Sequence, residues 1–62
     1  MNKPTAQILG EDGNVFNLIG ICTRALKKVG QTEQAAKLLE EVMNAASYEE
    51  ALRIMGKYCE IE

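Results

Sequence analysis

The chain has 62 residues, of which 47% are hydrophobic and 26% charged, and its formal net charge is −2. This composition is typical of one soluble globular domain and argues against disorder, while the acidic balance argues against a broad nucleic-acid-binding surface. The chain contains no His and a single Ser. We therefore expect a protein that is not an enzyme and that has no catalytic site, metal site or cofactor.

The first thirteen residues contain turn-forming residues on both sides of the apolar pair Ile8–Leu9. Residues 5–9 are consistent with a short strand, and residues 10–14 (Gly-Glu-Asp-Gly-Asn) predict a tight loop. Neither of two ligand-binding interpretations fits this loop. Its two carboxylates repel phosphate, and the glutamate that closes a calcium-binding EF-hand loop is missing. We interpret the loop as a structural turn.

A first amphipathic helix is predicted near residues 14–29. Asn14 is a good N-cap, and Gly30 suits the left-handed position that follows a helix. Apolar residues recur at steps of three and four between these limits, which is typical of one buried helix face. Phe16 and Ile21 flank this face on opposite sides and widen it.

Two further helices are predicted near residues 32–45 and 48–58. Thr32 is the expected cap of the second, and Ser47 starts the third through a capping box with Glu50. Glycines inside two of the helices, Gly20 and Gly56, predict a close crossing between helices, since each otherwise costs about 0.5–1 kcal/mol relative to Ala.

Together these elements predict a mainly α fold: one compact three-helix domain spanning residues 1–62. Residues 5–9 and 58–62 are additional candidates for short strands, which could pair with each other. The expected core consists of Val15, Leu18, Ile19, Cys22, Leu26, Leu38, Leu39, Val42, Leu52 and Met55.

The two cysteines, Cys22 and Cys59, lie on apolar helix faces. A redox pair or a disulfide is one interpretation, and burial as small hydrophobic side chains is the other. No basic residue adjoins either thiol in the sequence, so the sequence shows no source for a lowered pKa of either thiol. We expect two free, buried thiols.

Some apolar residues extend beyond one face per helix, and this excess predicts a surface for a protein partner or for a homodimer. The competing outcome is that residues 5–9 and 58–62 fold back over the same surface. A second hypothesis is nucleic-acid binding by the basic end of the first helix, although three positive charges there also complement the helix dipole. The candidate interaction residues are Phe16, Ile21, Tyr48, Ile54 and Tyr58, and the alternative nucleic-acid contacts are Arg24, Lys27 and Lys28.

The chain has no signal-peptide pattern and no apolar stretch long enough to span a bilayer. We therefore expect a cytoplasmic protein that makes no membrane contact.

One pattern spans nearly the whole chain. It consists of residues 10–20 (Gly-Glu-Asp-Gly-Asn-Val-Phe-Asn-Leu-Ile-Gly), 25–27 (Ala-Leu-Lys), Gly30 and 47–52 (Ser-Tyr-Glu-Glu-Ala-Leu), with Tyr58 near the end. It resembles a family of very short, uncharacterised proteins encoded mainly in phage and prophage genomes of Gram-positive bacteria. The resemblance implies phage or prophage origin and cytoplasmic location, and it transfers no activity and no site residues. Related members often have alternating apolar residues at both termini, which supports the terminal strands. The predicted function is a small protein–protein interaction or accessory module.

Overall fold

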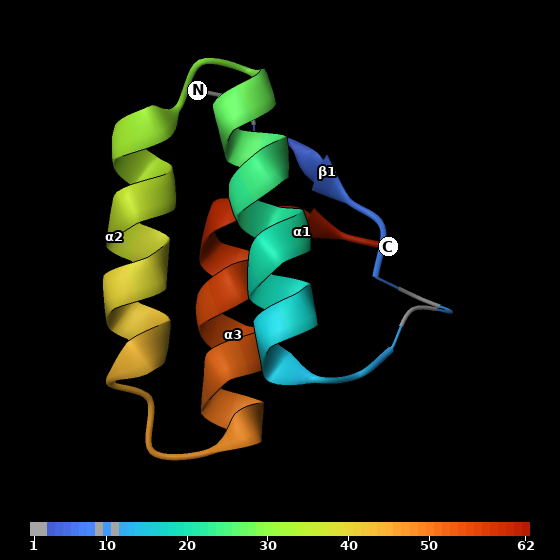
Figure 1. Cartoon of the computed structure of the whole chain (residues 1–62), viewed down its shortest axis with the longest axis vertical. Helices are drawn as coiled ribbons and strands as arrows, with labels where there is room; N and C mark the ends of the chain where they lie inside the picture. Colours follow the sequence, from blue (N-terminus) through green and yellow to red (C-terminus); the bar gives the residue numbers. More distant parts are fainter. Residues whose placement is uncertain (1–2, 9, 11) are drawn as a thin grey trace.

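Three helices run alternately up and down, and a two-stranded sheet lies beside them (Figure 1). The structure is a computed structural model that describes residues 3–8, 10 and 12–62. Within these residues the order is β1 (Thr5–Ala6), α1 (Val15–Lys28), α2 (Thr32–Met43), α3 (Tyr48–Tyr58) and β2 (Glu60–Ile61). The predicted three-helix fold is confirmed.

Helix α1 lies one residue inside the predicted range at each end, with Asn14 and Val29 as its caps. The Asn14 side chain accepts a hydrogen bond from the backbone N–H of Phe16 at 2.8 Å, and Asp12 in turn accepts one from the N–H of Asn14 at 3.1 Å. Gly30 follows the helix with a φ of 80°, a conformation that favours glycine.

Helix α2 departs from the prediction at both of its ends. Gln31, not Thr32, is the N-cap, because its carbonyl accepts the first helical hydrogen bond, from Ala35; within the described residues no side-chain capping bond is formed at this end. The helix stops at Met43 instead of residue 45. Asn44 is its C-cap, and the Asn44 side chain donates to the carbonyl of Glu40 at 2.9 Å.

Helix α3 has half of the predicted capping box. The Ser47 hydroxyl accepts a hydrogen bond from the N–H of Glu50 at 3.1 Å, as expected. The Glu50 carboxylate bonds the N–H of Ala46 at 3.4 Å instead of the N–H of Ser47. Both bonds still tie the loop to the first turn of the helix.

The two terminal segments pair with each other, which settles that open question. β1 and β2 are parallel, with Thr5 opposite Glu60 and Ala6 opposite Ile61. Parallel pairing requires a long crossover, and here the three helices provide it. Both strands are shorter than expected, since Tyr58 belongs to α3; Leu9 lies outside the described residues. Lys3 also ties this end to α3, donating to the carbonyl of Gly56 at 2.9 Å.

The core lies between the helices and under β1. Two predictions about it are wrong: Leu39 is 45% exposed, and Ile54, expected at the surface, is only 9% exposed. Val15 and Leu52 are half-buried at its margin. The buried side chains are Ala6, Leu18, Ile19, Cys22, Leu26, Ala35, Leu38, Val42, Ala51, Ile54, Met55 and Cys59.

The expected close crossing at the helical glycines is also wrong. A Cβ atom added at Gly20 or at Gly56 meets nothing within 4 Å. Packing inside the domain therefore does not explain either glycine.

Candidate functional site

The five candidate interaction residues do not form one surface. Phe16 is the most exposed of them, at 68%, whereas Ile54 is buried in the core. Ile21 is half-buried beside β1, which agrees with the alternative prediction that the terminal segments fold back over this surface. Tyr48 stays partly exposed, but its hydroxyl donates to the carbonyl of Gly13 at 2.6 Å and ties α3 to the segment before α1.

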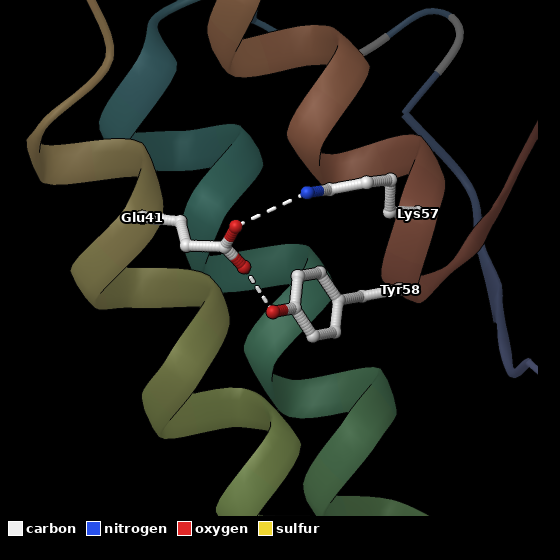
Figure 2. A network of polar contacts seen from close by, with 3 residues as sticks. All are labelled: Glu41, Lys57 and Tyr58. Carbon is white, nitrogen blue, oxygen red and sulfur yellow. Dashed lines mark hydrogen bonds and ion pairs between the residues drawn. The ribbon is translucent and has the colours of Figure 1, made fainter.

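Tyr58 is used inside the domain, in a polar cluster between α2 and α3. Its hydroxyl donates to one oxygen of the Glu41 carboxylate, and the Lys57 ammonium reaches the other oxygen at 3.1 Å (Figure 2). The Glu41 carboxylate thus joins α2 to α3. Tyr58 is therefore not free to contact a partner through its hydroxyl.

The cluster shifts the pKa values of two of its members. Hydrogen bonds from Tyr58 and then Lys57 stabilise the ionised Glu41 carboxyl and lower its pKa below the usual value. The bond to Glu41 holds the Tyr58 proton and raises the pKa of Tyr58 to about 12. Near neutral pH Glu41 is therefore ionised and Tyr58 is protonated. In these states the cluster links α2 to α3.

The two thiols lie together in the core. Cys22 and Cys59 are buried and free, and the Cys59 thiol donates to the carbonyl of Cys22 at 3.7 Å. Burial raises the pKa of Cys22 to about 12 and also raises that of Cys59. Because the thiolate is the reactive form, both are poor nucleophiles and pack as small hydrophobic groups, as predicted.

The loop before α1 has the local bonds of a structural turn. Gly10 has a φ of 86°, and the carbonyl of Asp12 accepts a hydrogen bond from the Asn17 side chain at 3.0 Å. The Asp12 carboxylate is already bonded to the N–H of Asn14. Glu11, the other acidic residue of the predicted loop, lies outside the described residues.

The largest apolar side chains left exposed define a first candidate surface, which lies along the seam between α1 and α2. Phe16, Leu39 and Met43 form this surface, here called the α1–α2 face. Leu39 and Met43 are one turn apart on α2, on the side away from Glu41 and α3. Phe16 precedes Ile21, which lines the hollow beside β1, by five residues, and the two side chains therefore point about 140° apart around α1.

Phe16 and Met43 lie at the same end of the helix bundle. The residues that precede them, Val15 and Val42, line one shallow hollow at the end of the bundle where α1 begins and α2 ends. Phe16 is in the first turn of α1 and Met43 in the last turn of α2, and Leu39 lies one turn before Met43. Phe16 was expected at an interaction surface, whereas Leu39 was expected in the core.

A second candidate surface is a hollow of about 470 Å³ between β1 and the C-terminal half of α1, here called the β1–α1 groove. Arg24 and Lys28 line it, but Lys27, the third basic candidate, does not. Adjacent helical residues point about 100° apart, which explains the separation. The apolar lining consists of Pro4, Ile21, Ala25 and Val29.

The described residues contain no group of three or more potential metal ligands, and none of their helices has the length and apolar character needed to cross a membrane. Comparison of the chain with protein-family models, curated proteins and solved structures gives no match. The resemblance to phage and prophage proteins, and the predicted function, therefore remain predictions.

Proposed function

We propose that this chain is a small non-enzymatic interaction module that associates with a second copy of itself through the α1–α2 face. The observation that carries the proposal is the exposure of Phe16, Leu39 and Met43, at 68%, 45% and 61%, along one helix seam. Contiguous apolar surface on a small soluble domain is characteristic of interaction sites. A thin core is also commonly supplemented by pairing.

The charges beside this face favour a second copy as the partner. Lys27 lies eleven residues after Phe16, about three turns along the same side of α1. Glu33 and Glu40 are exposed on α2. A twofold axis parallel to the helices sets α1 of one copy against α2 of the other. Because α1 ends where α2 begins, Lys27 of one copy then lies opposite Glu33 of its partner.

Nucleic-acid binding through Arg24, Lys27 and Lys28 has weaker support. Only two of these side chains line a common groove, Lys27 and Lys28 also lie in the last turn of α1, and the whole chain is acidic. We also propose a cytoplasmic location, which rests on the resemblance to phage and prophage proteins.

Sedimentation equilibrium over about a hundredfold range of protein concentration tests self-association, because dimerisation follows mass action. We expect the mass of the natural chain to rise from one chain toward two. The double variant Leu39→Gln, Met43→Gln should keep the mass of one chain. Val29→Gln is the matched control, because it removes a similarly exposed apolar side chain from the other surface. A natural chain that keeps the mass of one chain throughout would overturn the proposal.

A further inference from the structure

The β1–α1 groove combines an apolar floor with two unpaired cations. Among the described residues the ion pair of Lys57 with Glu41 is the only one, so neither Arg24 nor Lys28 has an acidic partner within that part of the chain. They lie one turn apart on α1 and both line the groove. In a chain whose net charge is −2, this hollow is a local site for negative charge.

One wall of the groove is the free edge of a sheet. The carbonyl of Pro4 accepts a hydrogen bond from the N–H of Glu60 in β2, and the carbonyl of Ala6 and the N–H of Ile8 bond Glu62, the residue after β2. Along a strand, the N–H and carbonyl of successive residues point alternately to one edge and to the other. The N–H and carbonyl of Thr5 therefore point away from β2. No hydrogen bond within the described part of the chain uses them. Thr5 is also one of the residues that line the groove.

We propose that the β1–α1 groove binds an extended acidic segment of another protein, which adds as a strand to the free edge of β1. Backbone pairing would use the N–H and carbonyl of Thr5, as in other cases of strand addition. Alternate side chains of the segment point the same way, so carboxylates at every second position face α1, where Arg24 and Lys28 lie. This site is separate from the α1–α2 face and does not depend on self-association.

The same features make a nucleic-acid strand a poorer occupant. A phosphate backbone has no N–H and carbonyl pattern to match the edge at Thr5, and a strand held by phosphates needs a longer row of cations than Arg24 and Lys28 provide. The groove therefore combines two requirements, a free strand edge and negative charge, that an acidic peptide meets together.

The direct test is a fluorescence-polarisation titration of the natural chain with a short labelled peptide of alternating Glu and Val. We expect saturable binding that weakens with added salt. Two control peptides separate the contributions of charge and of backbone hydrogen bonds to binding. A peptide of alternating Lys and Val reverses the charge, and an N-methylated peptide of alternating Glu and Val cannot donate backbone hydrogen bonds. Neither control should bind. Labelled single-stranded DNA tests the competing occupant.

Three variants of the chain locate the site. Thr5→Pro removes the outward N–H of β1, and an edge position tolerates proline because its N–H is not used by β2. Arg24→Gln with Lys28→Gln removes the charge. Each should weaken binding about tenfold or more, while the far-UV circular dichroism stays that of the natural chain. Leu39→Gln, on the α1–α2 face, should bind like the natural chain.

The outcomes separate the two proposals. Groove variants that lose the peptide but sediment like the natural chain support a second, independent surface. Absence of saturable peptide binding, equal binding by the N-methylated peptide, unchanged binding after Thr5→Pro, or preferential binding of DNA would each overturn the groove proposal and leave self-association unaffected.

Discussion

Leu38 and Leu39 are neighbours in α2, yet they should respond very differently to truncation. Leu38 is 0% exposed and Leu39 is 45% exposed. Leu38→Ala leaves a cavity in the core and should cost about 2–5 kcal/mol. A domain of this length is stabilised by only about 3–9 kcal/mol in total. The variant should therefore be largely unfolded or much less stable. Leu39→Ala should change the free energy of unfolding by no more than about 0.5 kcal/mol.

Urea unfolding followed by far-UV circular dichroism measures this difference, since the chain has no Trp for fluorescence. Leu38→Met keeps the side-chain volume and should cost less than about 1.5 kcal/mol, which provides a folded control. Because Leu39 belongs to the proposed self-association face, the midpoints should be compared at low protein concentration, where mass action favours single chains. Equal costs for the two alanine variants, or a larger cost for Leu39→Ala, would refute the placement of the core.

The fold also predicts how three more variants and a change of pH affect stability. Ser47→Ala should lower stability by about 1 kcal/mol through the lost cap of α3, and an unchanged melting temperature would contradict this. Gly56→Ala should raise stability by about 0.5–1 kcal/mol, because an added Cβ meets nothing within 4 Å. Gly30→Ala should lower stability by about 1–2 kcal/mol, because its φ is 80°; the two glycine variants melting alike would refute this contrast. Above pH 9 stability should fall, because the folded chain raises the pKa values of Cys22 and Tyr58 to about 12 and the unfolded chain loses these protons first. Tyr58→Phe should reduce the slope of this fall, and stability that rises with pH in this range would reverse the assignment.

Local signals in the sequence were sufficient for the helices and most of their limits. Asn14, Gly30 and Ser47 act through bonds or backbone angles within a few residues, so their effects can be predicted without the rest of the fold. The centre of each buried face depends on where the other elements pack. For this reason the spacing of apolar residues alone could not show that Leu39 is exposed and Ile54 buried.

The candidate surfaces were less predictable because they depend on contacts between distant segments. Glu41 and Tyr58 are 17 residues apart, and no local pattern indicates their hydrogen bond. The groove beside Arg24 exists only because β1 lies against α1, and the sequence suggested the strand without its position. Phe16, by contrast, was identified correctly as exposed, since it falls outside the buried face of α1.

The parallel pairing of Thr5 with Glu60 also sets the order of events during synthesis on the ribosome. β1 is translated before any of the helices, but its partner strand is translated only after all three. The helices are built from local contacts and can form early, whereas this pairing joins the two most distant elements of the fold. Until residues 60–62 have been made, both edges of β1 are unpaired. A chain that stops before Glu60 should therefore expose a free strand and be more prone to aggregate than the full chain.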